Sequence, residues 1–196
     1  MSIGDSPSSE SMIPVQADQL RQAMRRFVSG VTVVTAQNEV ELAGITVSAF
    51  SSISLDPPVI MVSINTASSV APVILDAEAF AVHILSNDQE ALSVRFAESL
   101  SWEEKIGDTE WGQGISGAPI LTDSYTTLDC ELIRSLVIGT HTIMLGRVLE
   151  IRLLEPTPKA PLLYYDQNYR TLDRIPEDPT ERKHRSTQIE NTDQHR

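Results

Sequence analysis

Apolar and polar residues alternate along most of the middle of the chain, and this alternation predicts a protein built mainly from β-strands. The alternation is clearest at Ile143, Leu145, Leu149, Ile151 and Leu153. Strands are expected over residues 31–36, 40–55, 59–65, 80–86, 125–136 and 140–154. Turns at residues 37–39 and 137–139 favour hairpins, so the sheet is expected to be antiparallel throughout.

Helical spacing interrupts this pattern in three places. The first predicted helix begins with Asp18 as its N-cap, ends at Gly30 and turns an apolar face inward, formed by Leu20, Ala23, Met24, Phe27 and Val28. Two further helices are expected over residues 70–75 and 87–97. Residues 98–118 are interpreted as a long irregular connection, of the kind that forms lids or partner-facing surfaces.

The stretch over residues 44–58 departs from an ordinary strand because it carries many small hydroxyl side chains: Thr46, Ser48, Ser51, Ser52 and Ser54. Short side chains let a flat ligand approach the backbone, and hydroxyls can hydrogen-bond its edge without adding charge. No His, Glu, Lys or Cys lies between Gly44 and Leu55, so the stretch fits ligand binding better than proton transfer. The competing interpretation is an exposed edge strand rich in Ser and Thr.

A phosphate-binding turn is a second candidate. A strand that ends at Asn65 and passes through Ser68 and Ser69 into a helix N-terminus would present free backbone N–H groups to an anion, with Arg95 as a suitable cation. Ordinary N-capping explains Ser69 equally well. The first helix also carries Arg21, Arg25 and Arg26, which could meet a ligand phosphate, although a solvated helix face is the preferred interpretation.

The two central histidines have different surroundings. His83 alternates with apolar residues and is expected to be a hydrogen-bonded histidine of the sheet, and Cys130 a small core residue. His141 follows Gly139 at a strand start between polar neighbours, so packing explains it less easily. Residues 161–170 hold three of the four tyrosines, which indicates either an aromatic flank to a site or an aromatic turn that closes a barrel.

Composition narrows the function classes. The 196 residues are 41% hydrophobic, which suits one domain, and the net charge of −12 argues against nucleic-acid or anionic membrane surfaces. The single cysteine excludes an internal disulfide and fits a cytoplasmic setting. We find no zinc-ligand spacing, membrane-spanning run, signal peptide, Rossmann fingerprint, phosphate loop or nucleophile elbow. The expected organisation is a loose arm over residues 1–16, one domain over 17–172 and an arm-like tail over 173–196.

Six segments together resemble the flavin reductase-like family, which has the FMN-binding split-barrel fold. They are residues 26–35 (RFVSGVTVVT), 44–52 (GITVSAFSS), 54–58 (SLDPP), 95–97 (RFA), 139–148 (GTHTIMLGRV) and 161–165 (PLLYY). The chain is most similar to the reductase components of two-component aromatic hydroxylases of the 4-hydroxyphenylacetate type. The resemblance spans about residues 18–172.

This resemblance implies a homodimer with a six-stranded antiparallel Greek-key split barrel and a few peripheral helices. It implies hydride transfer from NADH or NADPH to FMN or FAD, and diffusion of reduced flavin to a separate oxygenase. The implied flavin-binding residues are Thr46, Val47, Ser48, Ser51 and Ser52, with Asn65, Ser68, Ser69 and Arg95 at its phosphate. His141 matches a Gly-Asp-His motif near the nicotinamide, with Tyr169 near the same face, and Thr140 stands where that motif often has Asp.

Two other functions stay open on the sequence. One is a flavoprotein of the same fold that keeps its flavin bound and reduces another acceptor, such as a ferric chelate. The other is a flavin carrier without enzymatic activity. Turnover of excess free flavin separates the reductase from both.

Overall fold

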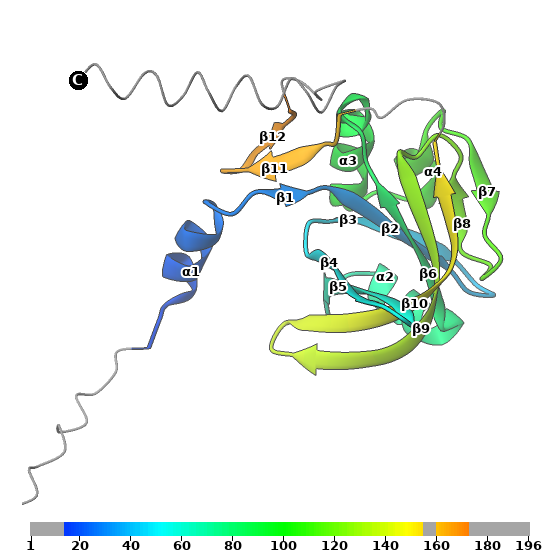
Figure 1. Ribbon diagram of the computed structural model, residues 1–196, viewed down its shortest axis with the longest axis horizontal. Coiled ribbons are helices and arrows are strands. Elements are labelled where there is room, and N and C mark those ends of the chain that lie inside the picture. The colour runs from blue at the N-terminus through cyan, green and yellow to red at the C-terminus, as the bar shows by residue number, and fades with distance from the viewer. Residues whose placement is uncertain (1–13, 155–159, 173–196) are drawn as a thin grey trace, which may run out of the picture.

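The computed structural model describes residues 14–154 and 160–172, and it is organised around one curved sheet (Figure 1). Seven strands follow the order β3-β2-β6-β9-β10-β5-β4, and every pairing is antiparallel. Their bounds are β2 (Thr32–Gln37), β3 (Leu42–Val47), β4 (Phe50–Leu55), β5 (Pro58–Asn65), β6 (Ala79–Ile84), β9 (Thr126–Ile138) and β10 (His141–Leu153). The mainly β antiparallel expectation is confirmed.

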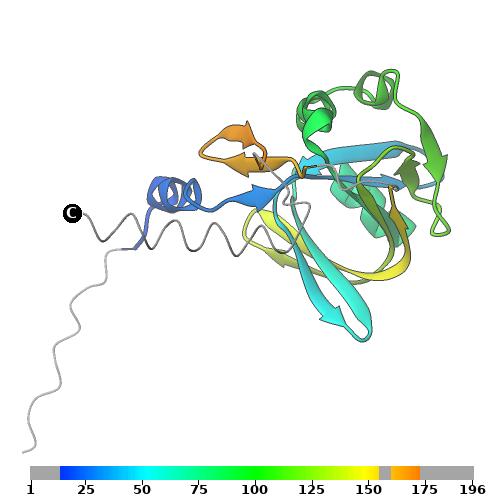
Figure 2. The same ribbon diagram turned by 45° about the horizontal axis from the view of Figure 1, so that its top comes forward.

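The main sheet has seven strands rather than the six expected, because the hydroxyl-rich stretch is not one continuous strand. The chain leaves β3 after Val47, turns through Ser48 and Ala49, and enters β4 at the opposite edge of the sheet. The Ser63 backbone N–H of β5 donates to the Ala49 carbonyl at 3.0 Å, which ties this corner to the far edge. The β4–β5 hairpin then projects away from the rest of the sheet (Figure 2).

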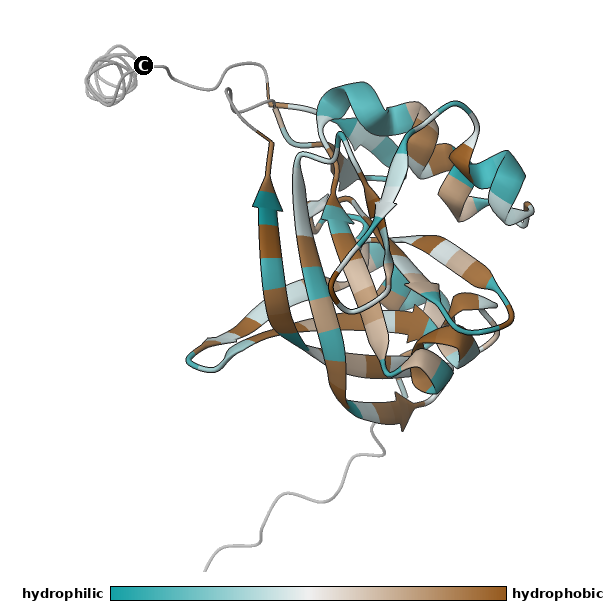
Figure 3. Ribbon diagram, turned by 90° about the vertical axis from the view of Figure 1, so that its right-hand side faces the viewer, coloured by the Kyte–Doolittle hydropathy of each residue, from teal (hydrophilic) through white to brown (hydrophobic). Residues whose placement is uncertain are grey.

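Core residues lie on both faces of strand β2, because successive side chains of a strand point in opposite directions. Val34 packs into the inner core, which helix α2 (Val70–Ala77) fills with its own apolar residues, Val70, Ala71, Val73 and Ile74. Val33 packs into an outer core with Leu92 and Phe96 of helix α3 (Glu90–Ala97). Alternating hydrophobic and hydrophilic residues are visible along the strands (Figure 3).

Helix α1 (Ala17–Met24) differs from its sequence prediction at both ends. Gln16 occupies the N-cap position and forms a capping box with Gln19, so the prediction of Asp18 as N-cap is wrong. The helix ends before Gly30 because Ser29–Gly30 form strand β1, which pairs with β11 (Leu163–Tyr165). β11 pairs in turn with β12 (Asn168–Arg170), and α1 lies beside this small sheet, away from the main sheet (Figures 1 and 2).

The apolar face of α1 does not face inward as expected. No residue of the helix is buried, and Leu20 and Phe27 keep 57% and 66% of their surface exposed. The sequence pattern therefore identified an amphipathic segment correctly. Within the described part of the chain, however, no other element buries the apolar face of α1.

Residues 98–118 are more regular than the irregular connection expected. They contain helix α4 (Trp102–Ile106) and strand β7 (Trp111–Gln113), which pairs with β8 (Pro119–Leu121). Ser101 caps α4 through a capping box with Glu104. A 3-10 turn, η1 (Asn87–Gln89), precedes α3 and fills the start of the helix predicted over residues 87–97.

Candidate functional site

The outer face of β3 is the wall from which the site is built. Gly44, Thr46 and Ser48 alternate on this face, while Val47 points into the inner core. A Cβ added to Gly44 would meet the Phe96 ring of α3 at 2.6 Å, so only glycine lets the helix approach so closely here. Small residues on β3 thus serve helix packing first, and Ser48, beyond the helix, is the exposed one.

A chain of hydroxyl groups joins this wall to the aromatic segment. The Thr46 hydroxyl donates to the Ser93 carbonyl at 2.6 Å, and the Ser93 hydroxyl lies 2.8 Å from the Tyr169 hydroxyl. Tyr169 meets Tyr164 edge to face, with ring centroids 5.6 Å apart. The tyrosine-rich residues therefore lie beside β3 and α3, in the β11–β12 hairpin of the small sheet.

Two neighbouring cavities open at Ser48. The smaller, of about 170 Å³, is lined by Thr46, Ser48, Ala97, Tyr164, Tyr169 and Val31. The larger, of about 420 Å³, shares Ser48 and Tyr164 and extends between α1 and the β11–β12 hairpin. Cavities of a few hundred cubic ångströms with apolar and hydroxyl walls suit small organic ligands. The arrangement brings the predicted residues Thr46, Ser48 and Tyr169 together.

The remaining hydroxyls of the stretch lie past the corner, on the edge strand β4. Ser51 and Ser52 are exposed, and the Ser51 hydroxyl donates to the Ser52 carbonyl at 3.2 Å. Val47 is buried, and its carbonyl accepts a hydrogen bond from the Thr32 hydroxyl at 2.7 Å. A ligand on the outer face could therefore contact Val47 only through its backbone.

A second group gathers where β5 and β10 end. Asn65 and His141 are paired across these two strands. The Asn65 side-chain oxygen accepts from the Ala67 N–H, and its carbonyl accepts from the Ser68 N–H, both at 2.9 Å. The Thr66 N–H donates to the Thr140 carbonyl at 2.9 Å, so the predicted phosphate turn and the predicted nicotinamide histidine lie side by side.

The start of α2 matches its prediction in position but not in capping. Ser69 holds the N-cap position before Val70, yet its side chain accepts no capping hydrogen bond. Instead the Ser68 hydroxyl accepts from the Val70 N–H at 3.4 Å. The Ser69 hydroxyl, which is exposed, is thus not committed to the helix. Next to His141, the Thr140 hydroxyl lies 3.1 Å from the ring Nδ1 and replaces a carboxylate as its neighbour.

Arg95 belongs to a different group from the one predicted. Its Nε donates to the Lys105 carbonyl at 3.0 Å and its Nη2 to the Ile106 carbonyl at 3.5 Å. The guanidinium thus binds the C-terminal end of α4, which a helix terminus favours for a cation. Within residues 14–154 and 160–172, no hydrogen bond joins Arg95 to the turn at Asn65.

Lys105 was missed by the sequence analysis. Only 7% of it is exposed, its Nζ donates to the Gly44 carbonyl at 2.8 Å and lies 5.9 Å from the centre of the Phe96 ring. Burial lowers the pKa of this lysine, and none of the ion pairs among the described residues includes it. The signal that could have found α4, and with it this lysine, is the Ser-x-x-Glu capping box at Ser101.

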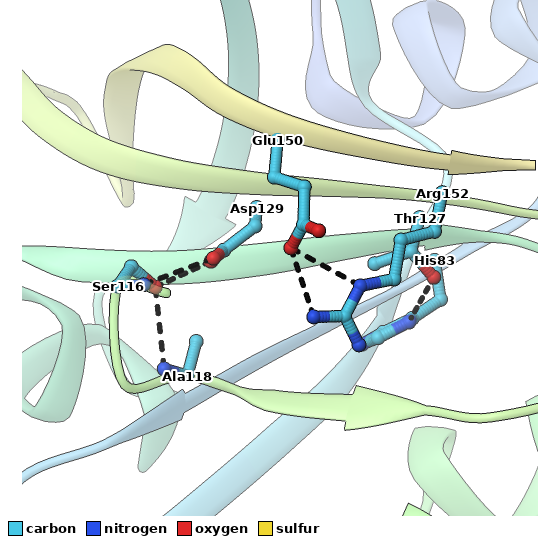
Figure 4. A network of polar contacts seen from close by, with 7 residues as sticks. All are labelled: His83, Ser116, Ala118, Thr127, Asp129, Glu150 and Arg152. Carbon is cyan, nitrogen blue, oxygen red and sulfur yellow. Dashed lines mark hydrogen bonds and ion pairs between the residues drawn. The ribbon is translucent and has the colours of Figure 1, made fainter. Parts of the chain in front are cut away.

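Two buried polar side chains, His83 and Asp129, form hydrogen bonds that stabilise the fold and do not line the candidate site (Figure 4). His83 is fully buried between the Thr35 and Thr127 hydroxyls, at 3.0 and 3.1 Å, which confirms the prediction of a sheet histidine. Asp129 is 1% exposed and accepts hydrogen bonds from the backbone and the hydroxyl of Ser116. Cys130 is buried as predicted, and burial raises its pKa to about 12, so the thiol does not serve as a nucleophile.

The described residues contain no cluster of three His, Cys, Asp or Glu side chains that could hold a metal ion. No helix within them is long and apolar enough to cross a membrane.

Comparisons with known proteins agree on one family. A model described as a flavin reductase like domain matches residues 24–173. The FMN reductase (NADH) RutF of Pantoea ananatis is 31% identical over 170 residues, which cover 87% of this chain and 88% of that protein. The reductase component of the FADH(2)-dependent resorcinol hydroxylase of Rhizobium sp. is 34% identical over 151 residues, which cover 76% of this chain and 83% of that protein. The solved structure of the NADH:FAD oxidoreductase SgcE6 of Streptomyces globisporus aligns with a TM-score of 0.75 at 28% identity, over 86% of this chain and 100% of that one.

Proposed function

The chain belongs to the flavin reductase like family, and on that premise we propose that it transfers a hydride from NADH or NADPH to FMN or FAD. Reduced flavin then leaves for a separate flavin-dependent oxygenase. Relatives with this division of labour support the second step, since one is named as the reductase component of a hydroxylase.

The observation that carries the proposal is the pair of cavities at Ser48. Their shared wall offers hydroxyls and tyrosine rings, and none of the residues lining the smaller cavity is an acid or a base. Such a wall fits a planar, uncharged ring system with polar edges. When flavin and nicotinamide are bound, they supply the hydride chemistry themselves. The protein's part is to bind both rings, orient them and exclude water.

Individual residues have distinct parts in this proposal. Ser48, with the backbone at Val47, would hold the ring edge, and Ser51 and Ser52 would follow the ribityl chain along β4. Thr46 and Tyr169 form the back of the cavity through their hydrogen bonds to Ser93.

The flavin phosphate is assigned to the turn from Asn65 to Ser69. The uncommitted Ser69 hydroxyl and the N-terminus of α2 both favour an anion at this point. Arg95 is left out of this phosphate site, because two of its donors are bound to carbonyls of α4.

His141 would help position the nicotinamide. Its exposed ring neighbours the phosphate turn through the pairing with Asn65, and Thr140 orients the ring through Nδ1. A hydroxyl can hold the ring in place without the charge of a carboxylate. The proposed role is therefore orientation rather than proton transfer.

The proposal includes a homodimer in the cytoplasm. Exposed apolar side chains gather on α1 and the residues after it, and at the tip of the β9–β10 hairpin: Leu20, Met24, Phe27 and Val28, and Leu136, Val137 and Ile138. Apolar surface of this kind is typical of a face covered in an oligomer. Light scattering at micromolar protein concentration tests it, and a monomer would contradict the dimer.

The activity is tested by anaerobic stopped-flow measurement of the visible absorbance of oxidised flavin. Purified protein is mixed with NADH or NADPH and with FMN or FAD, first at catalytic and then at excess concentration. Multiple turnovers of excess flavin are expected and identify both cosubstrates. Bleaching of one bound equivalent only would indicate another acceptor, and no bleaching would indicate a carrier.

The location of the flavin is tested at Ser48. Ser48→Ala removes the hydroxyl and keeps the space, whereas Ser48→Leu places a bulky side chain at the point where the two cavities meet. We expect flavin affinity to fall modestly in the first variant and by more than about tenfold in the second. Equal affinity in wild type and Ser48→Leu would refute this site.

A further inference from the structure

Ser93 is a buried polar residue in the middle of helix α3, and the packing of that helix alone does not explain it. None of its surface is exposed, and the other buried residues of the helix, Leu92 and Phe96, are apolar. Serine is a poorer helix former than alanine, and a hydroxyl taken out of water destabilises the fold unless it regains a hydrogen bond. A serine at this position therefore indicates a contact that alanine could not make.

Two hydrogen bonds of Ser93 reach two other elements. Its carbonyl accepts from the Thr46 hydroxyl of β3 at 2.6 Å, and its hydroxyl lies 2.8 Å from the Tyr169 hydroxyl of β12. Alanine would keep the first contact, because every residue carries a backbone carbonyl. Only the contact with Tyr169 requires the serine side chain, so the link between α3 and the β11–β12 hairpin is what serine adds.

The strand that carries Tyr169 is weakly held by its backbone. β12 lies at the edge of the small sheet, whose order is β1-β11-β12, and it pairs with β11 alone. In the described part of the chain, Ser93 is the one hydrogen-bond partner of the Tyr169 side chain. The direction of the Tyr169 ring therefore depends on this hydroxyl contact and on packing against Tyr164 and the outer core.

Tyr169 faces the smaller cavity, and Ser93 stands behind it. The Tyr169 ring lines the cavity of about 170 Å³ together with Thr46 and Ser48, whereas Ser93 lines neither of the two cavities at Ser48. A tyrosine released from its hydroxyl partner regains freedom about its side-chain torsions, and the cavity beside it gives the ring room to turn. A ring that turned into the cavity would occupy space assigned to the flavin.

We propose that Ser93 is a positioning residue for flavin, whose hydroxyl holds the Tyr169 ring in the wall of the smaller cavity and so keeps the cavity open. The proposal rests on the proposed function, because that function places the flavin ring at Ser48. Ser93 touches no ligand and acts through Tyr169. Since the bond is buried and joins two uncharged groups, its loss should weaken flavin binding about fivefold.

A double-mutant cycle on flavin affinity tests this role without any turnover. Dissociation constants for FMN and FAD are measured from the quenching of flavin fluorescence in wild type, Ser93→Ala, Tyr169→Phe and the double variant. Both single variants remove the same hydrogen bond, and Tyr169→Phe keeps the aromatic ring. We expect each to lose about fivefold in affinity, and the double variant to lose about fivefold as well rather than about 25-fold.

Ser124→Ala is the matched control. It removes the hydroxyl of another buried serine, which donates to the Ile84 and Thr126 carbonyls, and Ser124 lines neither of the two cavities at Ser48. It should destabilise the fold in urea about as much as Ser93→Ala and leave flavin affinity unchanged. Visible circular dichroism of bound flavin depends on how neighbouring groups hold the ring, so it should change alike in Ser93→Ala and Tyr169→Phe and stay as in wild type in Ser124→Ala.

Wild-type affinity in Ser93→Ala or in Tyr169→Phe would overturn the proposal, as would effects that multiply in the double variant or an equal loss in Ser124→Ala. If Ser93→Ala does not fold, Tyr169→Phe tests the same bond from the half-buried side. A wild type that binds flavin without reducing it would refute the reductase function and leave the cycle to decide the role of Ser93. A wild type that binds no flavin would refute both.

Discussion

His83 should make the stability of this protein fall as pH drops through the weakly acidic range. The side chain is fully buried, and the loss of solvation lowers its pKa from an ordinary 6.5 to about 3. The Thr35 hydroxyl donates to the Pro119 carbonyl at 2.7 Å, so it must accept from His83 Nε2. Nδ1 is left to accept from Thr127, and neutral histidine satisfies both contacts.

The direction and the size of this change in stability follow from proton binding to His83 in the folded and unfolded chain. Below pH 6.5 the unfolded chain binds a proton at His83 while the folded chain does not, down to about pH 3. Stability from this group is therefore complete above pH 6.5 and is lost as pH falls. Each pH unit within that range costs about 1.4 kcal/mol, so a change from pH 7.5 to 5.0 should cost about 2 kcal/mol.

Urea unfolding followed by circular dichroism measures the loss, at fixed protein concentration and without flavin, because ligands and dimerisation alter apparent stability. His83→Gln supplies the comparison, since it removes the titrating group and leaves the other histidines and the carboxylates. Wild type should lose about 2 kcal/mol more than the variant between the two pH values. Equal losses would refute a histidine that stays neutral when folded.

Three further changes test the packing and the site. Gly146→Ala should destabilise the fold by about 1–3 kcal/mol, because the new Cβ would overlap the Phe80 ring, whereas Gly112→Ala, with open space around it, should stay within about 0.5 kcal/mol in urea unfolding. Asp129→Asn should cost about 1–3 kcal/mol in the same assay, since an amide cannot accept both hydrogen bonds from the loop at Ser116. His141→Ala should lower flavin-reductase turnover by roughly tenfold through poorer nicotinamide orientation. An unchanged rate at all nicotinamide concentrations would remove His141 from the site.

Local patterns were enough to predict most of the strands. Alternation located β2, β5, β6, β9 and β10 to within a few residues, and the turn at residues 137–139 predicted the antiparallel pairing of β9 with β10. The same alternation could not divide β3 from β4, because Ser48 and Ala49 continue the pattern of small residues. What separates the strands is the hydrogen bond from Ser63, a residue fourteen positions further along the chain from Ala49.

The site was harder to predict for a related reason. From the sequence, residues could be chosen only by the chemistry of their side chains, and the positive charge of Arg95 made it a candidate for the phosphate turn. Its hydrogen bonds go instead to α4, a helix that the sequence analysis treated as irregular. Lys105 was missed with that helix. Arg25 was considered as a possible phosphate ligand, and the structure places its guanidinium beside Gln167 of the β11–β12 hairpin.

The outer face of β3 shows how packing decides which hydroxyls a ligand can reach. Gly44 is covered by Phe96 and its carbonyl is bound by Lys105, and the Thr46 hydroxyl is bound to Ser93. Helix α3 therefore covers the outward positions Gly44 and Thr46, and Ser48, the next outward position along the chain, is left open. Because the chain turns at this residue toward β4, the open hydroxyl lies where the edge strand, the tyrosine hairpin and α1 meet. The shape of the proposed flavin site thus depends on how closely α3 docks at Gly44, a position without any ligand contact of its own.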